Sequence, residues 1–510
     1  MRRKIPIERL ARISQIATAE TLLSLLIWVL FVALCVPILA FELIASRRYA
    51  DVVLICVIVV LICTAAGLYV SHFQKRITKN HTRAIAIAGL CLLLLAATRA
   101  TASFLGKTYG STDLAEVGAT GSAVTAAIIL TMAYDQRFAI GMSVFYCLLA
   151  CFAAMPVIDG RYQLPSIGLF LTIAAGAIIC CFCLKEIRTR IKLLKVSTFA
   201  AMVVFITAAA LDFLAPTTRP VEVVRNAAIH GGVTLGVGIV IEGLLPVIEK
   251  VFRIATSMTL LDYSDANQPL LKRLHMEAPG TFSHSLLIGS IAEAAAEAIR
   301  RNGLLSRVGA YYHDVGKLNK PGYFVENQMG SISRHKELAP AMSQLIIVGH
   351  VKDGIELAKE YGLPSVLRQF IETHHGTTLI EHFYHEAVKS ARSPMKDPQG
   401  KTADQPSESE FRYPGPKPRT KEAAIVMLAD TVEGAVRSLA DITPSRIEMV
   451  VHNMAMKRLQ DGQFDECDLT LLELSRIEAS ISKTLAAHYH GRIAYPHPPD
   501  AAEGNPPWDK

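Results

Sequence analysis

The sequence is poor in cysteine outside its apolar first half, and its one CxxC pair has no second pair nearby. Of the ten cysteines, only Cys467 falls in the C-terminal half. Cys180 and Cys183 have CxxC spacing, but they lie inside an apolar run. This pattern argues against a disulfide framework and against a thiolate zinc site. We interpret the other nine cysteines as small apolar residues of membrane helices.

The second half also lacks the alternation of apolar and polar residues that is typical of strands. From about Thr256, charged residues recur at helical spacing instead, which predicts an all-α fold. Proline near the first turn and glycine after the last one mark several helix ends. The predicted helices are Leu286–Arg301, Leu304–Asp314, Pro340–Tyr361, Pro364–His375 and Lys421–Leu439.

The first half consists of nearly continuous apolar runs, and 51% of the whole chain is hydrophobic. About 20 mostly apolar residues suffice to cross a bilayer as a helix. The sequence predicts about eight such spans: Leu22–Phe41, Val52–Val70, Ala84–Leu105, Ala115–Ala133, Phe138–Ile158, Leu164–Cys183, Leu194–Leu214 and Gly231–Ile248. A polytopic helical membrane domain in contact with lipid is therefore expected.

Lysine and arginine in the connecting segments predict the orientation. Basic clusters lie at the N-terminus, in the second loop (75–83) and in the sixth loop (185–195). With eight spans, all three clusters and the C-terminal half lie on the cytoplasmic side of the membrane. The net charge of +7 is thus an orientation signal, and no nucleic-acid polymer is expected as a partner.

Four ionisable residues fall inside or near the ends of the predicted spans. Such residues can mark the path of a ligand or an ion. All four are close enough to an interface to reach it or to pair, so we favour a structural role. They are Arg99, Glu116, Asp212 and Glu242.

Composition divides the chain into four predicted regions. A basic N-terminus (1–20) precedes the membrane domain (21–250). The helical cytoplasmic domain spans 256–490, and a Pro-rich tail spans 491–510. Within the cytoplasmic domain, residues 390–419 are rich in Pro, Ser and charge, which predicts a mobile insertion.

Histidine and aspartate recur in the second half in an order that suggests a metal centre. Imidazole and carboxylate are the ligands expected for Fe, Mn, Co or Zn. Seven such groups on five helices suffice for two divalent ions if one Asp bridges them, and two ions suit hydrolysis of a phosphodiester. The seven are His284, His313, Asp314, His350, His374, His375 and Asp430. Lys317, one turn after Asp314, is a candidate for contacting a substrate phosphate.

Longer stretches around these residues resemble the seven-transmembrane HD-domain phosphodiesterases of the PgpH type. The matching stretches are SDANQPLLKRLHMEAPGTFSHSL, YYHDVGK, NKPGYFVENQMG, LIIVGHVKDG, FIETHHGTT and MLADTVEGAVRSL. Members of that family carry a large extracellular domain after the first span. Here only Glu42–Asp51 lies between the first two predicted spans.

The resemblance implies a multi-pass protein of the bacterial inner membrane with a cytoplasmic HD phosphohydrolase domain. That domain would linearise cyclic di-AMP to pApA with a hydroxide activated by two metal ions, manganese or iron. His284, His313, Asp314 and Asp430 would bind one ion. The other would be bound by Asp314, as the bridge, together with His350, His374 and His375. Asp314 and Lys317 would be the catalytic residues. No further cofactor is implied.

Three alternatives stay open at this point. The first is an HD hydrolase that acts on another cyclic dinucleotide or nucleotide, although the glycine-tyrosine-proline motif of cyclic-di-GMP enzymes is absent after His375. The second is a non-enzymatic membrane receptor that binds a nucleotide. The third is a transporter with a regulatory domain. Association into a homo-oligomer is left open as well.

Overall fold

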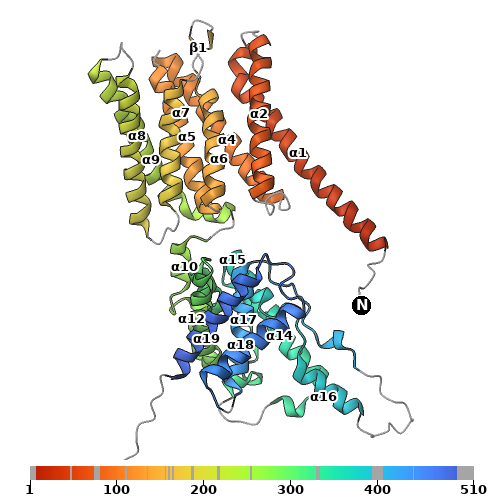
Figure 1. The fold of residues 1–510 in the computed structure, drawn as a ribbon. Coiled ribbons are helices and arrows are strands. Elements are labelled where there is room, and N and C mark those ends of the chain that lie inside the picture. Colours follow the sequence, from red (N-terminus) through yellow and green to blue (C-terminus); the bar gives the residue numbers. More distant parts are fainter. Residues whose placement is uncertain are drawn as a thin grey trace, which may run out of the picture. The chain divides into compact units, whose positions relative to one another are not determined.

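The computed structural model describes residues 7–490, apart from 46–48, 74–80, 110–111, 135, 156, 159–160, 163–165, 185–188, 215–218, 253–254, 329–333, 393–405 and 440. The chain forms two compact units, Met1–Met258 and Thr259–Lys510, which are described separately. Figure 1 gives the helix labels used below.

The described part of the first unit is a bundle of long helices. They are α1 (Ile7–Ala45), α2 (Tyr49–Phe73), α4 (His81–Tyr109), α5 (Thr112–Ala133), α6 (Gln136–Ala153), α7 (Ile167–Cys183), α8 (Arg190–Phe213) and α9 (Pro220–Phe252). Each of the predicted spans overlaps one of these helices. Seven helices are long and apolar enough to cross a membrane, and α7 is shorter, with 17 residues. That α7 also crosses the bilayer stays a prediction.

One predicted span ends earlier in the structure than in the prediction. Helix α6 stops at Ala153, and Val157–Ile158 (β1) pairs antiparallel with Arg161–Tyr162 (β2). The expected helix to Ile158 was therefore wrong at its C-terminal end. Met155 precedes a proline in the sequence, and a residue in that position is disfavoured from helical backbone angles.

Small residues place α5 at the centre of the bundle. Within its span 61% of the residues are buried, against 17% for α1 and for α2. Helices rich in Gly, Ala and Thr pack closely because little side chain separates their backbones. Helices α1 and α2 lie at one edge (red in Figure 1) and expose Leu22, Leu26 and Leu54. An outer surface of this kind suits contact with lipid.

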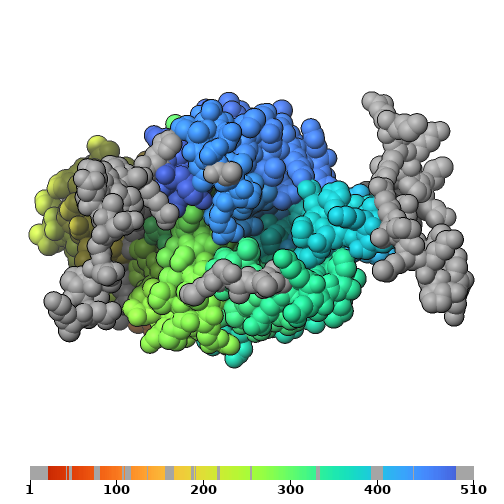
Figure 2. Space-filling model, turned by 90° about the horizontal axis from the view of Figure 1, so that it is seen from below, coloured from red at the N-terminus to blue at the C-terminus, as the bar shows by residue number. Residues whose placement is uncertain are grey.

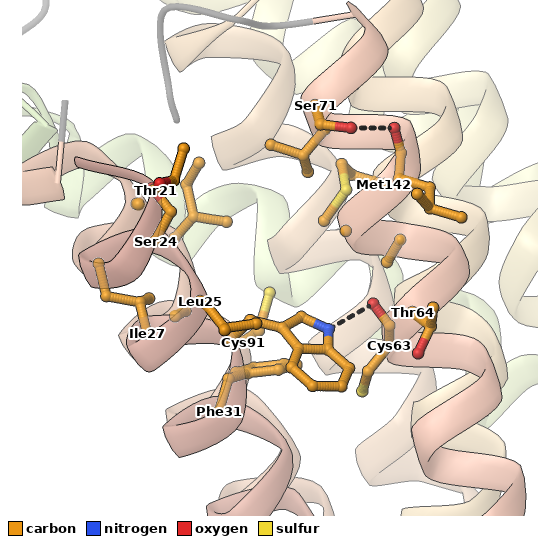
Figure 3. Close-up of a pocket in the computed structure, with 18 residues that line it drawn as sticks. Thr21, Ser24, Leu25, Ile27, Phe31, Cys63, Thr64, Ser71, Cys91 and Met142 are labelled. Atoms are coloured by element: carbon orange, nitrogen blue, oxygen red, sulfur yellow. Dashed lines mark hydrogen bonds between the residues drawn. The ribbon is translucent and has the colours of Figure 1, made fainter. Parts of the chain in front are cut away.

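An apolar pocket of about 520 Å³ is lined by residues between 21 and 31 of α1, between 63 and 71 of α2 and between 84 and 91 of α4, together with Met142 of α6. Trp28 on α1 lines it and donates from Nε1 to the carbonyl oxygen of Cys63 on α2, at 3.1 Å. Figure 3 shows Cys63 and other residues of this pocket. This hydrogen bond satisfies the indole N–H in surroundings that offer few other acceptors.

The second unit is helical in its described residues, with one isolated bridge between Leu379 and Arg412. Its α-helices are α10 (Ser257–Tyr263), α11 (Pro269–Glu277), α12 (Pro279–Ala298), α13 (Gly303–Tyr312), α14 (Pro340–Glu360), α15 (Ser365–Thr373), α16 (Glu381–Arg392), α17 (Lys421–Arg437), α18 (Pro444–Gln460) and α19 (Leu471–His490). Short 3₁₀ turns are η1 (Val315–Asn319), η2 (Pro321–Tyr323), η3 (Val325–Asn327), η4 (Arg334–Glu337) and η5 (Glu408–Phe411). The all-α prediction is confirmed.

Helix α17 is the core of this unit. Residues 423–429 are all buried, and α12, α13, α15, α18 and α19 pack around the helix. A helix that is apolar on every side is stable only when it is surrounded. Figure 2 shows one face of the unit, where the blue C-terminal segments lie against the green and teal ones. The burial of α17 fixes the position of Asp430, which directly follows this apolar stretch.

Part of the predicted mobile insertion is fixed in the structure. Ile380 donates from its N–H to the carbonyl of Phe411, and Tyr413 donates to Thr378. Phe411 and Tyr413 are buried, so this Pro-rich stretch, described from 406 onward, forms part of the domain. The stretch is held by hydrogen bonds to Thr378 and Ile380, which are distant in the sequence, and composition does not reveal such contacts. Residues 393–405 and the predicted tail 491–510 lie outside the described residues, as do the side chains of the predicted N-terminal region.

Candidate metal centre

All seven predicted ligands meet at one place in the second unit. His284 lies in α12, His350 in α14 and Asp430 in α17, whereas His313 and His374 are the residues that end α13 and α15. Two groups of four have their ligand atoms within 4.8 Å of one another, and Asp314 belongs to both. One group is His284, His313, Asp314 and Asp430; the other is Asp314, His350, His374 and His375.

Asp314 lies between the two groups because its two oxygens face different histidines. Its Oδ2 is 3.1 Å from Nε2 of His313 and 3.8 Å from Nε2 of His284. Its Oδ1 is 3.4 Å from Nε2 of His350 and 3.5 Å from Nε2 of His374. A carboxylate in this position can offer one oxygen to each of two cations.

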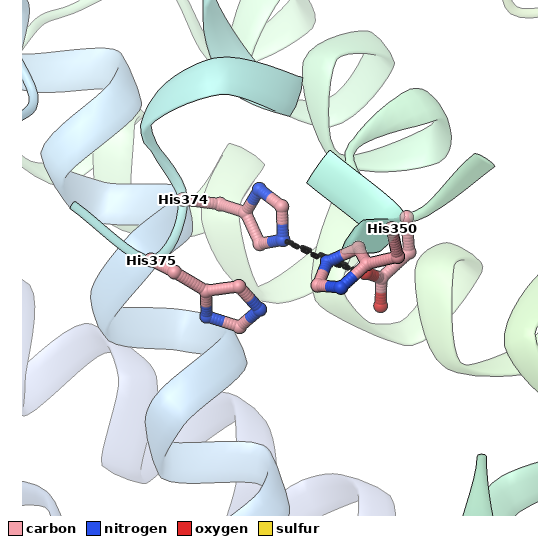
Figure 4. A group of neighbouring side chains, drawn as sticks. His350, His374 and His375 are labelled. Carbon is pink, nitrogen blue, oxygen red and sulfur yellow. Dashed lines mark hydrogen bonds and ion pairs between the residues drawn. The ribbon is translucent and has the colours of Figure 1, made fainter. Parts of the chain in front are cut away.

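Three of the histidines are oriented by their own helices. Nδ1 of His313 lies 2.6 Å from the carbonyl oxygen of Ala310, and Nδ1 of His374 lies 2.9 Å from that of Ile371. Nδ1 of His350 contacts the carbonyl of Ile347 in the same way. An Nδ1–H that donates to a carbonyl leaves the lone pair on Nε2. In each case Nε2 is the atom that faces the cluster, and Figure 4 shows the rings of His350 and His374 pointing toward each other.

Glu433 extends the cluster, and the sequence analysis did not identify it. Its Oε2 lies 2.9 Å from Nδ1 of His284, and its side chain is 4% exposed. On the other side of the same ring, Nε2 of His284 lies 3.0 Å from Oδ1 of Asp430. Glu433 stands three residues after Asp430 on α17, so the two carboxylates share one helix face. The three-residue spacing between Asp430 and Glu433 is the feature of the sequence that could have identified Glu433.

Lys317 lies beside the cluster, held between two carboxylates. Its Nζ is 2.7 Å from Oδ2 of Asp314 and 2.7 Å from Oε1 of Glu326. Glu326, from η3, also accepts a hydrogen bond of 3.1 Å from Thr281. The sequence analysis identified Lys317 but not Glu326. In the described arrangement the ammonium group of Lys317 therefore faces Asp314.

An aromatic side chain from the Pro-rich segment covers one histidine. The ring of Tyr413 stacks on His375, with ring centroids 4.3 Å apart and an interplanar angle of 24°. Composition had placed Tyr413 in the predicted insertion. His375 and Asp430 are only partly buried, whereas His313, Asp314 and His374 are fully buried. The accessible side of the cluster is therefore the side of His375 and Asp430.

Burial and charge divide the histidines into two kinds. Burial lowers the pKa of His350 to about 3 and lowers the pKa of His375 well below its ordinary value. These imidazoles are neutral at pH 7 and can donate a lone pair. Burial also acts against the charged form of His313, but the adjacent Asp314 outweighs it and raises the pKa of His313 to about 10.

Both aspartates stay ionised despite burial. Burial would raise their pKa, but the charges of His313 and Lys317 keep the pKa of Asp314 well below its usual range. The hydrogen bonds and charges of His284 and His313 do the same for Asp430. The cluster thus combines two anionic carboxylates with the neutral imidazoles of His350 and His375.

These residues fit a metal centre. Nε2 of His313 and Oδ1 of Asp314 are buried and make no hydrogen bond of acceptable geometry, although ionisable groups lie close to both. Buried polar atoms of this kind cost free energy unless something satisfies them. A cation among the Nε2 and carboxylate atoms would satisfy both. The described side chains could therefore hold divalent metal ions.

Comparison with known proteins agrees with this reading. Residues 49–256 match the family model described as "7TM receptor with intracellular HD hydrolase", and residues 281–435 match the HD domain model. Curated relatives include the cyclic-di-AMP phosphodiesterase PgpH of Bacillus subtilis, 38% identical over 72% of this chain and 50% of the relative. PgpH of Listeria monocytogenes is 42% identical over 53% of this chain and 35% of the relative.

The chain thus spans half or less of the length of these curated relatives. The crystal structure of the HD domain of L. monocytogenes PgpH is 42% identical; the match covers 44% of this chain and all of that one, with a TM-score of 0.40. The two family models lie in series on this chain, the first over the helical bundle and the second over the helices that carry the cluster. The chain therefore carries two matched regions in series, one similar to the seven-transmembrane receptors with an intracellular HD hydrolase and one similar to HD domains, and its long apolar helices support a multi-pass membrane protein.

Proposed function

We propose that this protein is a metal-dependent phosphodiesterase that hydrolyses cyclic di-AMP to pApA. The support for the activity is the match of residues 281–435 to the HD domain model, which follows a match to the model described as "7TM receptor with intracellular HD hydrolase". The support for the substrate is the name of the two curated relatives, both cyclic-di-AMP phosphodiesterases. The observation that carries the proposal is the position of Asp314 between two complete groups of ligand atoms.

Two divalent ions, manganese or iron, would occupy the two groups with Asp314 between them. Imidazole and carboxylate donors suit both metals. When bound, the ions would supply positive charge to the phosphodiester and acidify a water molecule. The seven predicted residues would be the ligands: His284, His313, Asp314, His350, His374, His375 and Asp430.

The protein's own residues would orient these ligands and the substrate. The carbonyls of Ala310 and Ile371 hold the imidazoles of His313 and His374 by Nδ1, so Nε2 remains available. Glu433, whose Oε2 lies 2.9 Å from Nδ1 of His284, would orient that ring in the same way. A substrate would approach from the side of His375 and Asp430, which is the less buried side. The Tyr413 ring, which stacks on His375, would be a candidate to meet a base, and the Lys317 ammonium group, beside Asp314, a candidate to meet a phosphate.

The place of the protein in the cell is part of the proposal. Basic segments at the N-terminus and in alternate loops support a bacterial inner membrane protein with the HD domain in the cytoplasm. A cyclic dinucleotide is a cytoplasmic messenger in this proposal, so substrate and HD domain would share one compartment. The predicted boundaries, a membrane domain at 21–250 and an HD domain at 256–490, belong to the same proposal.

The test is turnover by the full-length protein in lipid nanodiscs. It would be incubated with Mn²⁺ or Fe²⁺ and, separately, with cyclic di-AMP, cyclic di-GMP and cyclic GMP-AMP, and the products would be resolved by chromatography. We expect metal-dependent conversion of cyclic di-AMP to pApA, faster than either of the other two. Faster conversion of another cyclic dinucleotide would show that this compound, and not cyclic di-AMP, is the substrate. No turnover by protein with bound metal would leave a nucleotide receptor as the function.

A further inference from the structure

Arg458 on α18 is a partly buried cation that the proposed metal centre does not use. Its Nε and Nη2 groups both donate to the hydroxyl oxygen of Thr431, at 3.3 Å and 3.1 Å. Thr431 directly follows Asp430 on α17, and its own hydroxyl donates to the carbonyl oxygen of Met427. The guanidinium group therefore lies against the helix turn that carries one of the predicted metal ligands.

Among the residues that the structure describes, the side chain of Arg458 forms no ion pair, and its one hydrogen-bond acceptor is the neutral hydroxyl of Thr431. A guanidinium group has more N–H donors than one hydroxyl oxygen can satisfy. Its Nη1 group has no acceptor in the described part of the chain, yet it is not among the buried atoms that lack a partner. Nη1 is therefore open to an acceptor from outside the protein.

Two carboxylates close to Arg458 are already paired with other cations. Both oxygens of Asp461 accept hydrogen bonds from Arg412, at 2.9 Å and 3.1 Å. Glu381 pairs with Lys457. Arginine stays charged at physiological pH. The positive charge of Arg458 is therefore not compensated by a carboxylate of its own.

Arg458 lies on the accessible side of the metal cluster. Burial lowers the pKa of Arg458, and among the charges that oppose this effect that of Asp430 is the strongest. Burial raises the pKa of Tyr413, and the charges of Lys317 and Arg458 act against that effect. Tyr413 stacks on His375, and His375 and Asp430 are only partly buried. A nucleotide that enters from this side would meet the guanidinium group near the Tyr413 ring.

The chemistry of this group suits a phosphate. The N–H groups of a guanidinium match the oxygens of a phosphate, and hydrogen bonds between charged partners are roughly twice as strong as neutral ones. Lys317, by contrast, lies 2.7 Å from the carboxylates of both Asp314 and Glu326, which compensate its charge. Arg458 therefore has the more available positive charge of the two.

We infer that Arg458 binds a phosphate group of the cyclic dinucleotide on the Asp430 side of the cluster. Thr431 holds the guanidinium group by Nε and Nη2, which leaves Nη1 for the phosphate. The inference rests on the proposed function, because it requires that the site takes a nucleotide. It adds a substrate-binding residue that belongs to neither group of predicted metal ligands.

The experiment is ligand binding by the full-length protein in nanodiscs, after treatment with a chelator to prevent hydrolysis. Dissociation constants would be measured for cyclic di-AMP and for an analogue in which uncharged methylphosphonates replace both phosphates. The ratio of the two constants reports how strongly the protein favours the charged phosphates. If binding needs Mn²⁺, the ratio is taken from the KM of cyclic di-AMP and the inhibition constant of the analogue.

Wild type would be compared with Arg458→Gln and with Arg446→Gln. Arg446 is an exposed arginine near the start of the same helix, where it pairs with Asp441, so its variant is the matched control. We expect wild type and the control to favour cyclic di-AMP over the analogue to the same degree. In Arg458→Gln this preference should fall about tenfold or more, because a hydrogen bond between charged partners is lost.

The outcomes separate the inference from the proposed function. An unchanged preference in a folded Arg458→Gln protein would overturn the inference, while hydrolysis by wild type would still support the function. Binding of cyclic di-AMP without hydrolysis would overturn the hydrolase, and a lowered preference in Arg458→Gln would still support the phosphate contact. If wild type did not bind cyclic di-AMP with or without Mn²⁺, both would be wrong.

A second variant protects the test against misfolding of Arg458→Gln. Arg458→Met removes the charge and keeps a long side chain, and the Thr431 hydroxyl retains its bond to the carbonyl of Met427. The preference for cyclic di-AMP should fall in this variant as it does in Arg458→Gln. A wild-type preference in a folded Arg458→Met protein would count against the inference even if Arg458→Gln did not fold.

Discussion

Both carboxylate oxygens of Asp314 face imidazole nitrogens, at 3.1 Å on one side and at 3.4 Å on the other. Removing this side chain takes one ligand from each candidate group at once. At the scale of single residues, a substitution of Asp314 is therefore the change that should remove metal binding with the least effect on folding.

We expect Asp314→Ala to abolish cyclic di-AMP hydrolysis, with a loss on the order of 1,000-fold or more. Its helical circular dichroism should match wild type, because the helices around the cluster have their own apolar core. His382→Gln is the control, since His382 is an exposed histidine outside both groups. Turnover at the wild-type rate in Asp314→Ala would contradict the proposed role.

Oε2 of Glu433 lies 2.9 Å from Nδ1 of His284, and a carboxylate in this position beside a metal ligand commonly contributes 10–100-fold to metal affinity. We therefore predict that Glu433→Gln raises the dissociation constant for Mn²⁺ about 10–100-fold, measured by calorimetry on the full-length protein. Glu422→Gln, in the first turn of the same helix, removes a carboxylate away from the cluster and should leave the constant unchanged. Equal affinities in the two variants would show that Glu433 has no orienting role.

Metal affinity should also depend on pH in a stated direction. In the metal-free protein the pKa of His313 is raised to about 10, so its imidazole carries a proton at pH 7. A metal ion needs the neutral ring, and binding must release that proton. Affinity should therefore rise with pH between about 6 and 9. Calorimetry in two buffers of different ionisation enthalpy would count the protons; a count of zero at pH 7 would contradict this assignment.

At the scale of elements, the cluster depends on how closely η1 approaches α14. A Cβ added at Gly316 would lie 1.8 Å from the carbonyl oxygen of His350 and 2.5 Å from the amide nitrogen of Gly354. Both atoms belong to the backbone of α14, which cannot move without moving His350. Glycine at this position allows the turn that carries Asp314 to lie directly against the helix that carries His350.

Gly316→Ala should therefore lower the free energy of unfolding by about 1–3 kcal/mol and weaken metal binding. Gly349→Ala is the matched control, because nothing lies within 4 Å of the added Cβ there. In the control, alanine should be neutral or slightly stabilising, since it favours helix more than glycine does. Thermal unfolding and metal titration of both variants would test this; equal stability of the two would refute the close-approach argument.

At the scale of the whole molecule, two compact units with different cores are joined in one chain. The first buries small and aliphatic residues between long helices, and the second surrounds α17. If only the second unit holds the proposed metal ions, a chelator should act on that unit alone.

We predict that removing metal lowers the unfolding temperature of the HD unit and abolishes turnover, and that added Mn²⁺ restores both. A ligand present at 1,000 times its dissociation constant stabilises the folded state by about 4.1 kcal/mol. Unfolding followed by proteolysis with and without chelator would show which unit responds. Activity that survives exhaustive chelation would exclude the metal-dependent mechanism.

The sequence by itself determined the features that depend on local pattern. Long apolar runs fix where membrane helices form, because only a helix of that length can cross a bilayer with its backbone hydrogen bonds satisfied. The histidines and aspartates, each in or at the end of a helix, indicated the seven cluster residues, and the family resemblance gave their order a chemical meaning. Pro156 follows Met155 inside the predicted span 138–158, and this proline was the local signal that the prediction for α6 overlooked.

Only the tertiary structure decided which side chains complete the sites. Glu433 meets His284 and Tyr413 meets His375 across long stretches of chain, and no periodicity encodes such contacts. Glu116 and Asp212 had been interpreted as residues near a membrane interface, yet packing of four helices places them around one cavity with His230. The physical reason is that periodicity specifies which face of a helix is apolar, whereas the packing of several helices specifies which polar groups meet.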